Sequence, residues 1–261
     1  MSALDVPAGV QVLVHPTAEE AGRAAGREVA AELRRRLADQ SRVRVMFAAG
    51  PSQRFMLEAL RREPDIDWHR ISAFHMDEYL QLPEDAPQRW GLWLRQALFD
   101  HLPFAEVNLI RTDGDAQQRA DEYAGLLAAE PIDLVCFGIG VNGHLAFNDP
   151  PVADFDDPVD MKVVELDEVC RQQQVDDGCF ATMDDVPRLA ITVTIPPLLR
   201  AGRMVGVVTG APKSAAVRAT LMGPETTACP ASVLRRHPSC ILYLDEEAAG
   251  DLRAATQAGQ G

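Results

Sequence analysis

The chain has 261 residues, and its 25 Lys and Arg against 39 Asp and Glu give a formal net charge of −14. A chain this acidic is poorly suited to nucleic acid or to an anionic membrane surface, because both are bound through basic side chains. The apolar fraction of 47% is that of an ordinary globular protein. No apolar run approaches the roughly 18 residues that cross a bilayer, and the N-terminal residues lack the basic start of a secretory signal.

Cysteine usage bears on the compartment and on metal binding. The cysteines are scattered, no two form a CxxC pair, and none is spaced with a histidine as a zinc site requires. We therefore expect a reduced, cytoplasmic, metal-free protein. The residues concerned are Cys136, Cys170, Cys179, Cys229 and Cys240.

Helical and strand patterns alternate along the whole chain. A capping-box sequence, T-A-E-E, opens a long amphipathic helix from Thr17 to about Gln40. Further helices are expected after Ser52, which would cap its helix, with Pro87 in a first turn, and over residues 116–129, 213–221 and 246–255. Strands are expected over residues 42–50, 71–74, 107–110, 133–140, 162–166, 189–195, 203–210 and 240–245.

This alternation predicts a single α/β domain over residues 1–261, with a mainly parallel central sheet and helices on both faces, as in Rossmann-like folds. Residues 149–185 interrupt the alternation of strands and helices, because they are rich in Asp and Pro and too long for a simple connection. Long segments of this kind are often lids. We predict a lid at about 150–185, against the alternative of a solvated excursion, and disorder over residues 256–261.

Ligands of open parallel sheets bind at the carboxyl ends of the strands, and two loops there suit an anion. In the first, Gly50, Pro51, Ser52 and Gln53 lead from a strand into a helix, where free backbone N–H groups and a hydroxyl could cradle a phosphate. In the second, Lys213 stands at the start of another helix. The alternatives are a plain strand-to-helix turn and a solvated lysine.

The loop F-H-M-D-E-Y places two adjacent acids, Asp77 and Glu78, directly after a buried strand. Adjacent side chains point in different directions, so only one of the two acids can face a pocket. A partly desolvated carboxylate there could move a proton on carbon. The alternative is an N-cap aspartate beside a surface glutamate.

The loop G-I-G-V-N-G-H-L-A-F-N-D-P carries the strongest motif. Gly138 and Gly140 let the backbone approach a ligand closely. His144 has an amide, Asn142, and a carboxylate, Asp149, nearby in the sequence, as an oriented acid–base histidine requires. The alternative is a histidine that only satisfies the interior of the fold.

In their order and spacing these loops resemble the glucosamine-6-phosphate deaminase family, which is related to the 6-phosphogluconolactonases. The stretch P-A-S-V-L-R-R-H-P further along the chain is similar to the same family. The resemblance implies a cofactor-free reaction that opens the sugar ring, moves a proton from C2 to C1 and releases ammonia. It implies that Asp77 moves the proton and that His144, held by Asn142 and Asp149, opens the ring. The phosphate would lie against residues 50–53 and Lys213.

The sequence departs from the family pattern mainly at the phosphate end. Pro51 removes one N–H donor, and an arginine that the family uses for phosphate is replaced near Asp176 or Gly178. Asp149 stands where the family usually has glutamate, and Asn142 stands where many members have aspartate. The catalytic residues therefore match the family pattern better than the phosphate-binding residues do. The alternative substrates are a different amino sugar and one that is phosphorylated differently.

These observations predict an enzyme that isomerises and deaminates an amino-sugar phosphate, with glucosamine 6-phosphate and fructose 6-phosphate as the first choice of substrate and product. The alternatives are a 6-phosphogluconolactonase, in which His144 would activate water, and a non-catalytic sensor of sugar phosphates. The expected partner is a small sugar phosphate, with neither nucleic acid nor membrane, and a homo-oligomer is compatible with the sequence.

Overall fold

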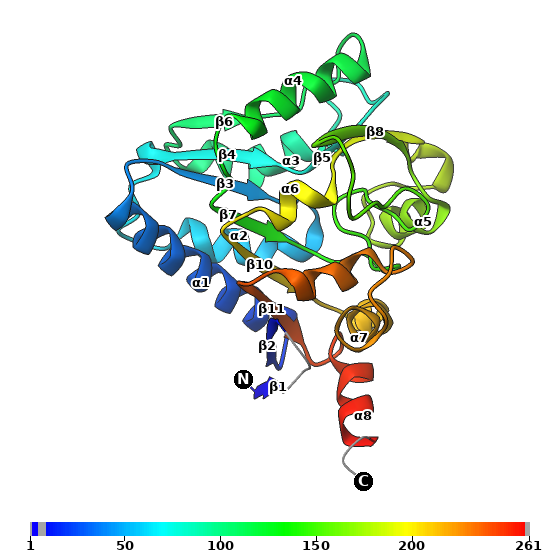
Figure 1. Cartoon of the computed structure of the whole chain (residues 1–261). Helices are drawn as coiled ribbons and strands as arrows, with labels where there is room; N and C mark the ends of the chain where they lie inside the picture. Colours follow the sequence, from blue (N-terminus) through cyan, green and yellow to red (C-terminus); the bar gives the residue numbers. More distant parts are fainter. Residues whose placement is uncertain (1, 5–8, 259–261) are drawn as a thin grey trace.

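The central sheet of the computed structural model, which describes residues 2–4 and 9–258, has the strand order β1-β2-β11-β10-β7-β3-β4-β6 (Figure 1). All neighbouring strands in it are parallel except the edge pair β1 and β2. This confirms the predicted mainly parallel sheet. The strands are β1 (Ser2–Leu4), β2 (Val10–His15), β3 (Val43–Phe47), β4 (Ile71–His75), β6 (Glu106–Asn108), β7 (Leu134–Phe137), β10 (Arg203–Val208) and β11 (Cys240–Asp245).

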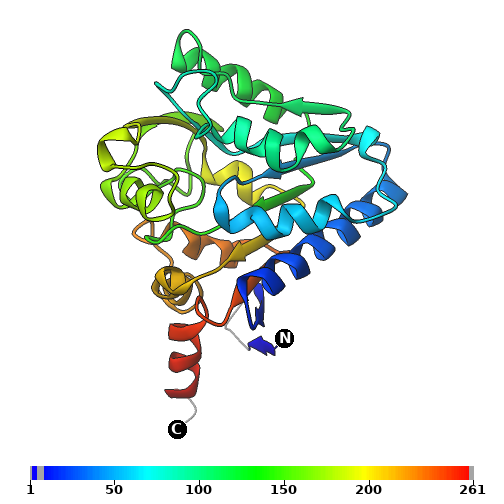
Figure 2. The same ribbon diagram turned by 180° about the vertical axis from the view of Figure 1, so that it is seen from behind.

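Helices cover both faces of this sheet, as Figures 1 and 2 show from opposite sides. Val45 and Phe47 of β3 pack with α1, α2 and α3, whereas Met46 between them packs with α4, α6 and α7 on the other face. Strands buried on both faces in this way read as continuous apolar runs. The helices are α1 (Ala18–Asp39), α2 (Arg54–Arg61), α3 (Trp90–Ala97), α4 (Ala116–Ala128), α6 (Ile195–Leu199), α7 (Ser214–Met222) and α8 (Gly250–Ala258).

A second, antiparallel sheet lies beside the first and has the order β5-β9-β8. It consists of β5 (Asp77–Tyr79), β8 (Met161–Glu165) and β9 (Leu189–Val193), and α5 (Glu168–Asp176) packs against it through a separate apolar cluster. Two of these strands were predicted, but strand patterns alone do not say to which sheet a strand belongs. The predicted strand 189–195 ends at Val193 because α6 begins at Ile195, followed by two prolines.

Residues 149–185 are less irregular than predicted, because they contain β8, α5 and a short 3₁₀ turn over Met183–Asp185. They are part of the second sheet and its covering helix. Their role as a lid stays a prediction.

Several predicted helix ends are wrong. Thr17 caps α1 as expected, but Ser52 lies inside a 3₁₀ turn, Pro51–Gln53, and accepts a hydrogen bond from Gln53 instead of capping α2. Pro87 precedes α3, which begins at Trp90. The last helix begins at Gly250 and continues to Ala258, so the disorder predicted from residue 256 is wrong as far as 258, while 259–261 lie outside the described residues.

The order of the strands brings the predicted loops together. The chain runs from β3 outward to β4 and β6, then returns to β7 on the other side of β3, so the direction of the order reverses between β3 and β7. Open α/β sheets bind ligands outside the strand ends at such a reversal. None of the helices over residues 9–258 is both long and apolar enough to span a membrane.

Candidate active site

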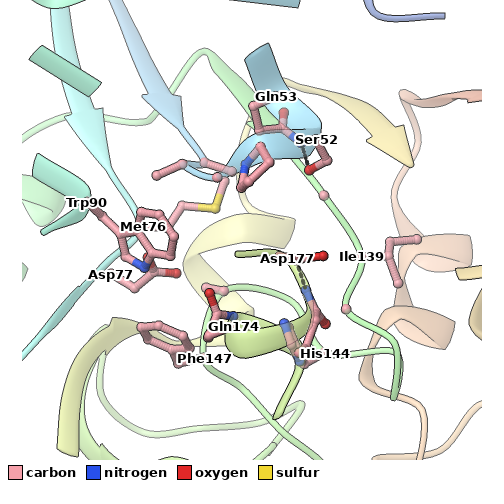
Figure 3. A pocket seen from close by; sticks show the side chains of 18 of the residues that line it. Ser52, Gln53, Met76, Asp77, Trp90, Ile139, His144, Phe147, Gln174 and Asp177 are labelled. Atoms are coloured by element: carbon pink, nitrogen blue, oxygen red, sulfur yellow. Dashed lines mark hydrogen bonds between the residues drawn. The ribbon is translucent and has the colours of Figure 1, made fainter. Parts of the chain in front are cut away.

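A cavity opens at the carboxyl ends of β10, β7, β3 and β4, which are neighbours in the sheet. It measures about 610 Å³ including the part open to solvent, which suits a small-molecule ligand. Figure 3 shows Asp77 and Trp90 on one side of it, His144 on another, and Ser52 and Gln53 at a third. Predicted residues that line it are Gly50, Pro51, Ser52, Gln53, Asp77, Gly138, Gly140, His144 and Lys213.

Asp77 and Glu78 point to opposite sides of the short strand β5, as their adjacency predicts. Asp77 lines the cavity, whereas Glu78 is only 1% exposed. The Glu78 carboxylate accepts hydrogen bonds from the backbone N–H groups of Tyr79, Trp90 and Gly91 at 2.9–3.0 Å. Glu78 therefore holds the start of α3, and the alternative of an N-cap aspartate with a surface glutamate is wrong.

The Asp77 carboxyl lines the cavity and is half-buried. Burial raises the pKa of this carboxyl to about 8, and the nearby charge of Glu78 acts in the same direction. Once ionised, a carboxylate with such a pKa accepts a proton more readily than an ordinary one. Asp77 is therefore suited to act as a base near neutral pH.

His144 is held by the two side chains that the sequence placed near it. Its Nδ1 lies 2.8 Å from Oδ1 of Asn142 and 2.9 Å from Oδ1 of Asp149, and the Asn142 amide donates to the same Asp149 oxygen. Both atoms facing Nδ1 are acceptors, so the hydrogen-bond network assigns the proton to Nδ1. Nε2 is then the ring nitrogen that remains to exchange a proton with a ligand.

Asn142 and Asp149 are not among the residues lining the cavity, so they support His144 from behind. Burial acts to raise the pKa of Asp149, but the hydrogen bonds from His144 and Asn142 hold it below its ordinary value. Aspartate is one methylene shorter than glutamate, but the Asp149 carboxylate still reaches the imidazole. A glycine is required at position 140, because a Cβ there would lie 2.2 Å from the His144 ring.

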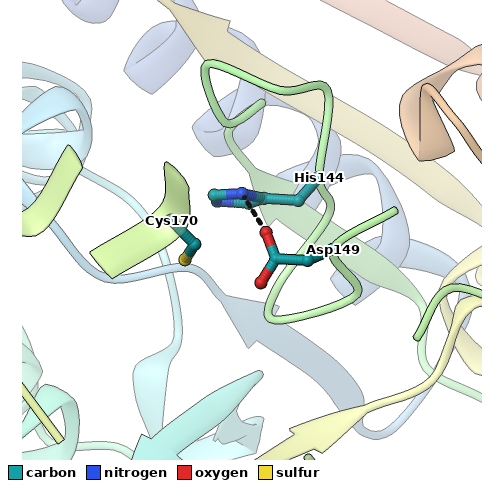
Figure 4. Close-up of side chains that lie close together, drawn as sticks. All are labelled: His144, Asp149 and Cys170. Atoms are coloured by element: carbon teal, nitrogen blue, oxygen red, sulfur yellow. Dashed lines mark ion pairs between the residues drawn. The ribbon is translucent and has the colours of Figure 1, made fainter. Parts of the chain in front are cut away.

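Cys170 of α5 lies against this pair, as Figure 4 shows, and the ligand atoms of His144, Asp149 and Cys170 all lie within 4.8 Å of one another. Three such groups could in principle hold a metal ion. However, burial raises the pKa of the Cys170 thiol well above its usual range, and metals bind the thiolate. Nδ1 of His144 is already joined to Asp149, so the cluster is better described as an extended hydrogen-bonded support.

Lys213 lies at the end of the cavity away from Asp77, whereas residues 50–53 follow β3, which lies between β10 and β4. Neighbouring strands lie about 4.8 Å apart, so the ends of β10 and β4, three intervals apart in the sheet, are separated by about 14 Å. Burial lowers the pKa of Lys213 to about 8, while the charge of Asp177 acts in the opposite direction. Gly50 turns the chain here at φ +109°, a conformation that favours glycine.

Sequence reasoning missed the part of the cavity wall that α5 provides. Gln173, Gln174 and Asp177 line the cavity from the end of this helix. Their spacing of i, i+1 and i+4 places them on one helical face, and this was the available signal in the polar run R-Q-Q-Q-V-D-D. Arg171 of the same helix donates to the backbone carbonyl of Val186 and does not line the cavity. Other lining residues that were missed are Ala48, Ala49, Met76, Trp90, Ile139, Ala146 and Phe147.

The fold places a carboxyl and an imidazole in one cavity at the switch point of an α/β sheet, an arrangement suited to acid–base chemistry on a small ligand. Comparison with known sequences gives the family: residues 16–242 match the profile of the glucosamine-6-phosphate isomerases/6-phosphogluconolactonase family, and the chain belongs to it. This confirms the resemblance drawn from the strand-end loops.

Individual relatives agree with this membership. A glucosamine-6-phosphate deaminase of Bacillus thuringiensis (strain Al Hakam) is 37% identical over 188 residues, which cover 72% of this chain and 70% of the relative. A solved monomeric glucosamine-6-phosphate deaminase is 26% identical with a TM-score of 0.84, covering 92% of this chain and 99% of that one. A 6-phosphogluconolactonase from Trypanosoma brucei, 20% identical with a TM-score of 0.75 over 95% and 100% of the two chains, shares the fold.

Proposed function

We propose that this enzyme converts glucosamine 6-phosphate and water into fructose 6-phosphate and ammonia, without a cofactor. The observation that carries the proposal is the pairing of a shielded carboxyl, Asp77, with an oriented imidazole, His144, in one cavity. The relatives named as glucosamine-6-phosphate deaminases support the same substrate. Its five cysteines are free thiols, which suits the reducing cytoplasm as the place of action.

The first step opens the sugar ring. His144 Nε2 takes the proton of the C1 hydroxyl and returns a proton to the ring oxygen as the bond between C1 and that oxygen breaks. The product is the open-chain aldehyde with its amino group still on C2. Asn142 and Asp149 keep the imidazole in the tautomer that this exchange needs.

The second step moves a proton along the carbon chain. Asp77 removes the proton from C2 while the C2 ammonium group passes one proton to O1, which gives a neutral enolamine. Asp77 then returns its proton to C1, which leaves an iminium group at C2. Water adds to C2 and passes both of its protons to the nitrogen, which departs as ammonium, so that C2 becomes the ketone of the product. Asp77 acts first as base and then as acid, and it ends in its starting state.

Lactone hydrolysis, the activity of other members of the family, uses the same cavity less completely. It requires one activated water molecule, which His144 can supply alone, and it includes no proton transfer on carbon for Asp77 to perform. Isomerisation with loss of ammonia uses both groups. The site therefore favours the deaminase reaction.

The direct test incubates the purified protein with glucosamine 6-phosphate and measures ammonia and fructose 6-phosphate together. We expect the two products in equal amounts. Incubation with 6-phosphogluconolactone provides the matched comparison, and we expect hydrolysis no faster than without protein. Lactone hydrolysis without ammonia release would assign the chain to the lactonase branch instead.

The substitution Lys213→Ala is expected to raise KM for glucosamine 6-phosphate by about tenfold or more, since a hydrogen bond to a charged group contributes about 1.5–3 kcal/mol. The value of kcat should change little, because the lysine lies at the end of the cavity away from Asp77. Steady-state kinetics with glucosamine as second substrate provide the control, since its KM should not change. An unchanged KM for the phosphorylated sugar would remove Lys213 from the phosphate site.

The pH dependence of kcat/KM should pass through a maximum near pH 8. The pKa of Asp77, raised to about 8, means that the base is ionised progressively as the pH rises. The pKa of Lys213, lowered to about 8, means that its positive charge is lost over the same range. Below pH 8 activity should rise with pH, and above it binding of the phosphate should weaken.

The variant Lys213→Arg separates these two effects, because its guanidinium stays charged throughout the range. The acidic limb of the profile should remain, and the alkaline limb should move to higher pH. Titration of the substrate itself is common to both proteins and cancels in the comparison. A profile that is flat between pH 6 and 8 in both would contradict the role of Asp77.

A further inference from the structure

The end of the cavity around Lys213 contains an acid as well as a cation. Asp177 caps the carboxyl end of α5 and lines the cavity with Lys213. The carboxyl end of a helix carries partial negative charge of its own. Among the described residues that line the cavity, the side chains that carry charge at neutral pH at this end are therefore one lysine and one aspartate.

The carboxylate of Asp177 is held in place by a neighbour on α5. Nε2 of Gln173 donates to Oδ2 of Asp177 at 3.1 Å, while Oε1 of Gln173 accepts from the backbone N–H of Val141 at 3.0 Å. Gln173 thus ties Asp177 to the loop that carries His144. Burial lowers the pKa of Lys213, and the charge of Asp177, which lines the same cavity, acts in the opposite direction.

We propose that Asp177 is a specificity-determining residue, which balances Lys213 and makes the site accept amino sugars without a phosphate alongside the phosphorylated ones. A phosphate dianion at this end of the cavity is attracted by the charge of Lys213 and repelled by the charge of Asp177. A hydroxyl at the same place is nearly indifferent to both. The preference for a phosphorylated substrate is consequently small. This inference rests on the proposed function, because it names the substrate class of the same site.

Solvent screening weakens the repulsion between Asp177 and a phosphate but does not remove it. Asp177 is exposed at the open side of the cavity. A pair of exposed charges changes a binding equilibrium by up to about fivefold. We therefore expect Asp177 to weaken the binding of a phosphate dianion by about threefold to tenfold. Replacing Asp177 by asparagine removes the charge and keeps an oxygen that can accept the hydrogen bond from Gln173.

The experiment measures ammonia release at pH 7 from glucosamine 6-phosphate and from glucosamine, for the parent protein and for Asp177→Asn. We expect the parent to use both sugars. The variant should show a KM for the phosphorylated sugar about threefold to tenfold lower, with kcat and the constants for glucosamine nearly unchanged. The matched control is Asp176→Asn, an exposed neighbour that bonds to Gln172 and does not line the cavity. It should leave every constant unchanged.

Calorimetric titration with inorganic phosphate tests the same inference without turnover. Phosphate should bind more tightly to Asp177→Asn than to the parent or to Asp176→Asn. Equal phosphate affinity in all three proteins, or a parent that discriminates against glucosamine by more than about a hundredfold, overturns the inference. If neither sugar yields ammonia, the proposed function fails, and the phosphate titration alone still decides whether Asp177 opposes an anion.

Discussion

The variant Asp77→Asn should lose turnover of glucosamine 6-phosphate by about 10²- to 10⁴-fold in kcat, which is the usual range for removal of a general base. Asparagine has nearly the same shape and fits the same place on β5, but it cannot take a proton from carbon. KM should change little, because the phosphate end of the cavity is untouched. Steady-state ammonia release measures the loss, and retention of more than about a tenth of the parent activity would remove Asp77 from the mechanism.

The neighbouring acid provides the matched control. Glu78→Gln removes a carboxylate that faces away from the cavity and accepts three backbone N–H groups at the start of α3. This variant should lose stability, seen as a lower Tm, because buried N–H groups lose a charged acceptor. Asp77→Asn should instead lose its chemistry without a lower Tm, because burial of the Asp77 carboxyl raises its pKa and therefore opposes folding at neutral pH. The two adjacent acids thus give opposite results if the structure assigns them correctly.

The variant His144→Gln should lose about 10²-fold or more in kcat/KM on glucosamine 6-phosphate, whose ring must open before the carbon-bound proton can move. Glutamine can fill part of the space but cannot exchange a proton. The loss should be much smaller on a 2-amino aldotetrose 4-phosphate, because its terminal oxygen is esterified and it stays open-chain. Each variant is compared with the parent on the same substrate, so weaker binding of the shorter sugar cancels.

Equal losses on the cyclic and the open-chain substrate would show that His144 acts in the proton transfer itself and not in ring opening. The variant Asn142→Ala gives an intermediate test, because it leaves the imidazole and removes one of the two acceptors at Nδ1. We expect a partial loss that follows the same pattern between the two substrates, since the residue acts by positioning His144.

The parts of the site that local sequence determines could be predicted, and the parts that distant pairing determines could not. His144, Asn142 and Asp149 lie within eight positions of the chain, so one glycine-rich loop brings them together. That only one of Asp77 and Glu78 faces the cavity was predictable, because adjacent residues of an extended chain face opposite ways, and the resemblance to the family indicated Asp77. The parallel sheet followed from the alternation of apolar strands and amphipathic helices.

The wall formed by α5 depends on contacts far apart in the sequence. Gln173 and Asp177 reach the cavity because β8 pairs with β9 and β9 pairs with β5, which carries Asp77. No local pattern specifies that antiparallel sheet. The capping role of Glu78 has a similar origin, since its hydrogen bonds to Trp90 and Gly91 cross 12 and 13 positions. The error at Ser52 is different: a 3₁₀ turn that begins at Pro51 displaced the predicted cap.

The central claim is that ammonia leaves only after the proton on C2 has moved, and one labelling measurement tests it most directly. Glucosamine 6-phosphate carrying deuterium at C2 is converted by the purified enzyme, and the product is examined by NMR. We expect one ammonia for each fructose 6-phosphate, with the deuterium gone from C2 and found at C1 or in water. Release of ammonia into a sugar phosphate that retains deuterium at C2 would mean direct displacement of the amine, and it would contradict the proton transfer assigned to Asp77.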